Sequence, residues 1–270
     1  MHYREYPPHP ALAAHVDCVW AARAPASVHT HRVLPDNCVD ILWQDGGEAG
    51  FAVGMMSSPI LVASPLPVRT LAVRFKPGMA GLFLALPMQE ITDQRADMDL
   101  LWGRGEAHRL GDALWTSDAP SRVRLALIEQ ELLRRLRAGS NGVGSASNGG
   151  ADGAGATRAT VGMALAQRAV AALDSSGGAV RVEALADGLG VSRQHLAAQF
   201  RQHVGLSPKL FARICRFRRA TAAIKAAQAP DWAQLALECG YFDQSHLIHD
   251  FQEFSGSAPE RFHFSNQTLA

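Results

Sequence analysis

The sequence has no long apolar run and no leader-like start. No window of its 270 residues approaches the ~18 to 20 consecutive apolar residues that a membrane helix needs. The first ten residues, MHYREYPPHP, lack the basic and then apolar pattern of a secretory signal peptide. These absences argue against a membrane protein, and we expect a cytoplasmic protein with no membrane partner.

Cysteines and enzyme motifs are also scarce. The four cysteines stand far apart without a CxxC pair, which disfavours a zinc ribbon or a thioredoxin-type site and predicts reduced thiols. The sequence contains no nucleotide-binding glycine fingerprint, no GxSxG elbow and no HExxH motif. We therefore expect a protein that is not an enzyme and that holds no cofactor and no metal.

A biased segment divides the chain into two parts. Residues 139–156 read GSNGVGSASNGGADGAGA, which leaves almost nothing to bury, so this segment is predicted to be a flexible linker. Residues 157–270 hold 12 Lys and Arg against 9 Asp and Glu, or +3, whereas residues 1–156 hold 14 against 16, or −2. This asymmetry has the sign expected if the C-terminal part binds nucleic acid.

The N-terminal part, residues 1–138, alternates short apolar segments with glycine, proline and serine turns. Strands are predicted at 38–43, 51–53, 60–63 and 68–75. Helices are predicted at 78–85, 97–102, 106–115 and 121–138, the last with leucine and isoleucine at intervals of three and four. The predicted fold class is α+β: a mixed β-rich and helical N-terminal domain, joined by the linker to an all-α domain.

The C-terminal part, residues 157–270, contains an internal repeat. HLAAQFRQHVGLSP from His195 and HLIHDFQEFSGSAP from His246 align without a gap. Upstream of each copy an AxxxG pattern recurs, at 186–190 and at 236–240. The small alanine lets two helices approach closely, and the glycine supplies the sharp turn between them. This arrangement predicts two helix-turn-helix units.

The second helix of each unit is the candidate recognition helix. Leucine and phenylalanine repeat at i, i+4 and face inward, so the opposite face points at solvent or DNA. Ser192 is the predicted N-cap of the first such helix, and Asp243 or Ser245 that of the second. Gln and Arg can read purine edges in the major groove. The predicted DNA-contacting residues on these two helices are Ser192, Arg193, Gln194, Arg201, Gln244, Ser245, His246 and His249.

A single helix over 207–227 is predicted to connect the two units. If it holds both recognition helices on one side of B-DNA, they enter successive major-groove turns, about 34 Å apart. Its stripe of Lys209, Arg213 and Arg216 either meets phosphates or is a solvated face, and we add Lys209 and Arg213 to the predicted DNA contacts.

These residues resemble the AraC/XylS family of bacterial transcription regulators, whose DNA-binding domain is two helix-turn-helix units joined by a long helix. LADGLGVSRQHLAAQFRQHVGLSP is similar to the first unit and LALECGYFDQSHLIHDFQEFSGSAPERF to the second, over about residues 160–264. The resemblance implies promoter DNA and RNA polymerase as partners. His249, Gln252 and Glu253 stand where family members often carry a basic residue, which predicts phosphate binding that is weaker or depends on pH through His249.

The N-terminal part also resembles the sensor-type domain of some of these regulators. HRVLPDNCVDILW from His31 and VRFKPGMAGLFL from Val73 carry this similarity. It implies effector binding or dimerisation, and we expect a small-molecule effector or another signal, and a homodimer. The large aromatics of this part are candidates to line a pocket as well as to fill the core, namely Trp20, Trp43, Trp102 and Trp115. We take Trp20, Trp43 and Cys38 as the candidate ligand pocket.

Three other interpretations compete with this one. His29 and His31 form an HxH pattern, but Pro35 and Asp36 replace the acidic ligand that a cupin-type metal site needs. Cys18 and Cys38 would be redox or methyl-accepting thiols in a regulator that also repairs DNA, whereas buried thiols are the default. A constitutive architectural DNA binder would need no effector pocket.

Overall fold

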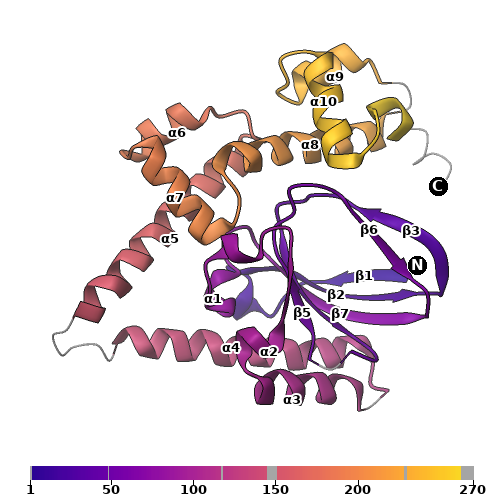
Figure 1. The fold of residues 1–270 in the computed structure, drawn as a ribbon, viewed down its shortest axis with the longest axis vertical. Coiled ribbons are helices and arrows are strands. Elements are labelled where there is room, and N and C mark those ends of the chain that lie inside the picture. Colours follow the sequence, from indigo (N-terminus) through magenta and orange to yellow (C-terminus); the bar gives the residue numbers. More distant parts are fainter. Residues whose placement is uncertain (1, 48, 117, 145–150, 228–229, 263–270) are drawn as a thin grey trace.

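The computed structural model describes residues 2–47, 49–116, 118–144, 151–227 and 230–262, without the side chains of residues 27–31, 64, 139–144 and 151–160. A β-rich N-terminal part and a helical C-terminal part lie against each other, with helix α8 running above the sheet in Figure 1. The predicted α+β class is confirmed. None of the described helices is long and apolar enough to cross a membrane.

A six-stranded antiparallel sheet forms the centre of the N-terminal part. In spatial order its strands are β1 (His2–Tyr6), β2 (Val16–Ala24), β7 (Val68–Phe75), β4 (Val39–Gln44), β5 (Phe51–Val53) and β8 (Arg95–Asp97). Strands β3 (Ser27–Val33) and β6 (Ile60–Ser64) pair separately. The sequence pattern located β4, β5, β6 and β7 but not the other four strands.

Strand β7 is the central strand of this sheet. Its Val73 lies opposite Val19 of β2 on one side and Ile41 of β4 on the other, and all three side chains are fully buried. Strand β4 buries alternate residues, Val39, Ile41 and Trp43, as the period of two predicts for a strand with one face against a core.

The helices of the N-terminal part pack against the sheet or against other helices. They are η1 (Pro10–Leu12), α1 (Gly81–Leu84), η2 (Met88–Ile91), α2 (Met98–Trp102), α3 (Arg104–Trp115) and α4 (Ser121–Gly144). Helix α4 lies along the sheet and buries Leu125, Ile128 and Leu132 completely (Figure 1). The apolar stripe of this helix is therefore part of the domain core.

Helix extends into both ends of the segment predicted to be a linker. Helix α4 continues to Gly144, and α5 (Ala151–Ser175) begins before residue 156. Residues 145–150, the middle of the predicted linker, lie outside the described residues. At the α5 end alanine, the strongest helix former, alternates with glycine, which favours helix in a segment with little to bury.

The C-terminal part consists of the two predicted helix-turn-helix units and their connecting helix. Its helices after α5 are α6 (Val182–Leu189), α7 (Arg193–Val204), α8 (Pro208–Ala226), α9 (Trp232–Glu238) and α10 (Gln244–Ser255). Gly190 after α6 has φ +70° and Gly240 after α9 has φ +83°, a conformation that glycine adopts without strain. The AxxxG glycines are thus the turn residues, as predicted.

Three segments of the N-terminal part donate hydrogen bonds to backbone carbonyls of the C-terminal part. The Thr92 hydroxyl after η2 donates to the Gly205 carbonyl at the end of α7, at 2.8 Å. The Asn37 amide, fully buried with φ +62°, donates to the Phe211 carbonyl of α8 at 3.1 Å. The Arg32 guanidinium donates to the Ser255 carbonyl at the end of α10. The N-terminal part therefore touches both helix-turn-helix units.

Candidate nucleic-acid interface

Side-chain caps begin both recognition helices. The Ser192 hydroxyl accepts from the His195 backbone N–H at 3.2 Å at the start of α7. The Asp243 carboxylate accepts from the His246 N–H at 2.8 Å at the start of α10. Each cap satisfies one otherwise unpaired amide of the first helical turn. Asp243, and not Ser245, is the cap of the second helix, which leaves Ser245 exposed.

Paired apolar anchors fix how these helices are rotated. Leu196 and Phe200 of α7, and Leu247 and Phe251 of α10, are fully buried. The Phe251 ring packs edge-on against Phe217 of α8, with 4.9 Å between ring centroids. Since buried residues at i and i+4 mark one helix face, the residues on the opposite side of each helix form its outer face.

The outer face of α7 presents the predicted polar residues. Arg193, Gln194 and Arg201 are all exposed. The Arg193 guanidinium lies 3.3 Å from the Glu183 carboxylate of α6, with both side chains more than 60% exposed. Such a solvent-exposed pair is weak and exchanges readily for another anion. Arg193 is therefore available to a base edge or a phosphate.

The outer face of α10 is less basic. Ser245 and His249 are exposed and Gln244 is half-buried. His246 is also half-buried: its ring packs edge-on against Tyr241 at 5.2 Å, and its Nδ1 accepts from the Phe242 N–H at 3.5 Å. His246 thus supports the turn before α10, and of the predicted residues it presents the least surface for DNA.

Phe242, in the turn between α9 and α10, was not predicted as a site residue. Its side chain is 86% exposed, two residues before the start of α10. An exposed aromatic ring beside a recognition helix can contact a thymine methyl group in the major groove. The available signal was a large aromatic residue directly before Asp243, a predicted N-cap of the second recognition helix.

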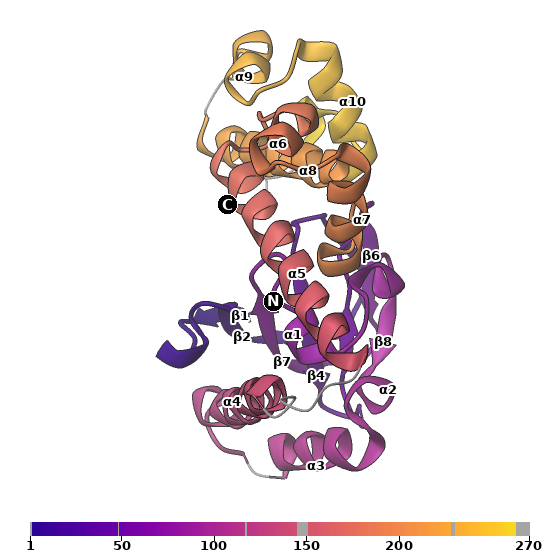
Figure 2. The same cartoon turned by 90° about the vertical axis from the view of Figure 1, so that its left-hand side faces the viewer.

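Both recognition helices lie on the same side of α8. Figure 2 shows α7 and α10 along the right-hand edge of the molecule, with α8 to their left. Two recognition helices on one side of the connecting helix are what simultaneous entry into successive major-groove turns requires.

The basic stripe of α8 divides into residues with different roles. Lys209 is exposed beside the start of α8. The Arg216 guanidinium donates to the Gly178 carbonyl at 2.6 Å and lies over the Tyr241 ring at 5.7 Å. The Arg213 guanidinium pairs with Asp250 at 2.7 Å and Glu253 at 2.5 Å, both on α10. Of this stripe, Lys209 alone is held by no contact that the described residues reveal.

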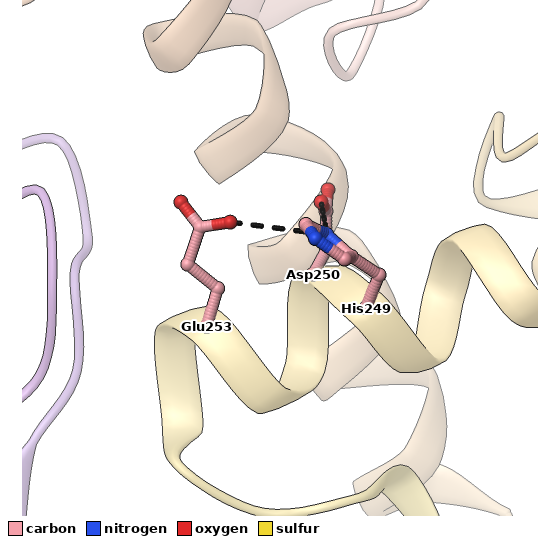
Figure 3. Close-up of side chains that lie close together, drawn as sticks. All are labelled: His249, Asp250 and Glu253. Atoms are coloured by element: carbon pink, nitrogen blue, oxygen red, sulfur yellow. Dashed lines mark ion pairs between the residues drawn. The ribbon is translucent and has the colours of Figure 1, made fainter.

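Asp250 and Glu253 also lie beside His249, and these three side chains could hold a cation together (Figure 3). The His249 Nδ1 is 3.7 Å from Asp250 Oδ1 and 3.8 Å from Glu253 Oε2. The Arg213 guanidinium already neutralises both carboxylates, so the cluster is an ion-pair network between α8 and α10. Arg213 therefore positions the second recognition helix, and we do not carry it forward as a phosphate contact.

The residues predicted to line a ligand pocket are mostly core. Trp43 is 1% exposed, with its ring 6.0 Å from Trp102, and Trp20 packs against Tyr3 at 5.4 Å. Cys38 is half-buried, and its backbone N–H donates to the Asp36 carboxylate at 3.0 Å. None of the three predicted residues borders the cavities near β2 and β5, whereas Trp115 borders the first of these.

The thiols are poorly suited to act as nucleophiles. Burial raises the pKa of Cys18 to about 12 and that of Cys215 to about 11. Burial and the neighbouring Asp36 raise the pKa of Cys38 still further. Since the thiolate is the reactive form, these environments disfavour the redox and methyl-accepting interpretations.

Two family models match the chain. Residues 4–97 match a family described as a domain of unknown function (DUF6597), and residues 185–263 match a helix-turn-helix domain. No curated protein sequence matches the chain.

Solved structures of several regulators are similar to parts or most of the chain. The C-terminal domain of AraT, a response regulator from Geobacillus stearothermophilus, is 20% identical over 37% of this chain and 84% of its own, with a TM-score of 0.36. A DNA-binding transcriptional dual regulator from Escherichia coli K-12 is 21% identical over 38% and 93%, with a TM-score of 0.34. ToxT from Vibrio cholerae O395 is 10% identical over 91% and 96%, with a TM-score of 0.44.

The helix-turn-helix match and the geometry of α6 to α10 define the class: this is a DNA-binding transcription regulator and not an enzyme. More narrowly, its helix-turn-helix domain is of the AraC type, and it follows an N-terminal domain of the DUF6597 family. The resemblance found in the sequence is confirmed to this extent.

Proposed function

We propose that the protein reads promoter DNA sequence-specifically through α7 and α10, and that a signal at the N-terminal domain controls this binding. One observation carries the proposal: two capped recognition helices, each with exposed polar residues, lie on the same side of α8 (Figure 2). The proposed DNA contacts are Ser192, Arg193, Gln194, Arg201, Lys209, Gln244, Ser245 and His249, with Phe242 added and His246 in a supporting position.

Control by the N-terminal domain is supported by its contacts with both helix-turn-helix units. Thr92 bonds the end of α7, Asn37 bonds α8, and Arg32 bonds the end of α10. A change in the N-terminal domain that moves these groups alters the relative placement of the two recognition helices. Two-state control of this kind needs a ligand that prefers one of the two placements.

The proposed organisation follows from these roles. Residues 1–138 form the sensing and dimerisation domain, residues 139–156 join the parts, and residues 157–270 form the DNA-binding domain. The proposed partners are double-stranded promoter DNA, RNA polymerase, a small-molecule effector and a second copy of the chain, in the cytoplasm.

Single alanine substitutions test sequence reading. We expect Arg193→Ala and Gln244→Ala each to weaken binding to a selected site by ~1 to 3 kcal/mol, because base-edge contacts have that size. Binding to random DNA is expected to change much less. The measurement is fluorescence anisotropy on both DNAs at one salt concentration, after selection of bound genomic fragments. Equal losses on both DNAs would reduce these residues to phosphate contacts.

Lys209 is expected to act through charge alone. Lys209→Ala should lower affinity for every DNA sequence and reduce the slope of log K against log salt by about 1, because one phosphate contact is lost. Lys225→Ala, at an exposed position in the last turn of α8, is the matched control. An unchanged salt slope in Lys209→Ala removes this residue from the interface.

The selection of bound genomic fragments also distinguishes a sequence-specific regulator from a constitutive architectural DNA binder. A DNA binder without sequence preference would enrich no recurring site, whereas dual reading predicts two short elements about one helical turn apart. A ligand that raises the melting temperature and shifts DNA affinity further supports the regulated protein.

A further inference from the structure

A cavity of about 270 Å³ lies at one end of the sheet, far along β2 and β7 from the contacts with α8. Strands β1, β2 and β7 form one wall, and the end of α3 with the first turn of α4 forms the other. Its lining residues are His2, Arg4, Tyr6, Ala21, Ala22, Arg23, Arg69, Thr70, Leu71, Trp115, Ser121 and Arg124.

The lining carries an excess of positive charge. Four arginines border the cavity, and no acidic residue does. The Arg69 guanidinium is paired with Asp45 at 2.7 Å and with the exposed Asp118 at 3.4 Å, both outside the lining. Arg4 and Arg23 are exposed at the mouth.

Arg124 is the deepest of these cations. It is 4% exposed, and its Nε and Nη1 have no hydrogen-bond partner among the described residues. Its guanidinium lies over the Trp115 ring, 4.9 Å from the centroid. Burial and the nearby charges of Arg69 and Arg23 lower the pKa of Arg124. A buried guanidinium without a carboxylate is costly, and an anion would relieve that cost.

The unpaired groups in this cavity are all donors. Besides the two Arg124 nitrogens, the Trp115 indole N–H is buried without a partner. Buried donors without a partner favour an oxyanion, because ionised acceptors form the strongest bonds with guanidinium groups. Ala21, Ala22 and Leu71 add an apolar patch to the wall, beside the polar side chains of Thr70 and Ser121. The cavity is also slightly smaller than the ~300 to 1,000 Å³ of drug-sized ligand sites.

We propose that this cavity is the effector site and that it binds a small organic carboxylate with an apolar body, with Arg124 holding the carboxylate. The proposal rests on the proposed function only in calling the bound carboxylate an effector, that is, a ligand that controls DNA binding. The cavity's binding chemistry is independent of DNA.

Calorimetric titration of the full chain tests the site without DNA. The probes are benzoate, its neutral analogue benzamide, and inorganic phosphate, in a low-chloride buffer. We expect benzoate to bind at least about ten-fold more tightly than benzamide, because charge-assisted bonds to a guanidinium are worth that much. Benzoate should also bind more tightly than phosphate, which gains nothing from the apolar patch.

Three variants locate the binding. Arg124→Gln is expected to weaken benzoate binding roughly ten-fold or more. Arg23→Gln, at an exposed position whose change leaves folding intact, is expected to weaken it by a factor of roughly two to five by removing a nearby charge. Arg137→Gln removes an exposed arginine from the same helix as Arg124, away from the lining, and should leave binding unchanged.

Several outcomes would overturn the site. They are equal affinities for benzoate and benzamide, preference for inorganic phosphate, or wild-type binding in both Arg124→Gln and Arg23→Gln. If carboxylate binding depends on Arg124 but does not change specific DNA binding, the binding site is supported and its role as an effector site is rejected. Failure of the chain to select a DNA sequence would reject the proposed function and leave the titration unaffected.

Discussion

Replacing Arg213 by methionine is expected to lower the free energy of unfolding by about 3 to 5 kcal/mol, because it leaves a buried carboxylate without its cation. The Asp250 side chain is 1% exposed, and Arg213 bonds it at 2.7 Å. Methionine keeps an apolar stem over the Phe254 ring, on which the guanidinium lies at 4.8 Å, so the loss reports the charge. Urea unfolding followed by circular dichroism measures it.

Two further variants separate the ion pair from a phosphate contact. Adding Asp250→Asn to Arg213→Met removes the orphaned charge, and we expect the double variant to recover most of the lost stability. Lys209→Ala, at an exposed position on the same helix, should change stability by less than about 0.5 kcal/mol. If Arg213→Met unfolds like the parent chain but shows a smaller salt slope on DNA, Arg213 belongs with the phosphate contacts after all.

Gly178→Ala is expected to cost at least about 4 kcal/mol, since two independent penalties coincide there. Gly178 has φ +78°, where an L residue is disfavoured by ~1 to 2 kcal/mol. An added Cβ would also lie 2.1 Å from the Ala212 carbonyl oxygen, which is backbone and cannot rotate away. The segment between α5 and α6 would have to move off α8, with loss of the Arg216 bond to the Gly178 carbonyl.

Gly188→Ala is the matched control for that substitution. Gly188 lies within α6, has no positive φ, and has no atom within 4 Å of an added Cβ. Alanine there should raise stability by roughly 0.5 to 1 kcal/mol through helix propensity. Calorimetric melting of the two variants should therefore give shifts of opposite sign. A Gly178→Ala chain that melts within a few degrees of the parent would show that this segment is not held against α8.

Sequence reasoning succeeded where the pattern is local. The AxxxG turns, the Ser192 cap and the alternating strand β4 depend on residues close together in the chain, and each was predicted at its position. Strand β1 was missed because its HYREY residues are mostly exposed and show no apolar alternation. Strand β2 was missed because it buries consecutive residues and contains alanines, which are poor strand formers.

Features that depend on residues far apart in the sequence could not be predicted. Arg213 and Asp250 are 37 positions apart, so the helical wheel of α8 alone made Arg213 look like a free basic residue. The cavity arginines come from positions 4, 23, 69 and 124, which no spacing rule connects. The tryptophans predicted to line a pocket, Trp20 and Trp43, are core residues, whereas Trp115 borders the cavity. The order of the strands decides which tryptophan reaches a cavity, and this order cannot be read from local sequence.

Strand β7 runs from the arginine-lined cavity to the contact between the N-terminal part and α8. At one end Arg69, Thr70 and Leu71 border the cavity, and at the other Arg74 binds Asp36, the neighbour of the Asn37 that bonds α8. These ends are about 17 Å apart at ~3.3 Å per residue. Because β7 is paired on both edges, a one-residue slip would reverse the facing of its whole side-chain set. We therefore expect a ligand that displaces β7 at the arginine end to move Arg74, and with it Asp36 and Asn37 beneath α8.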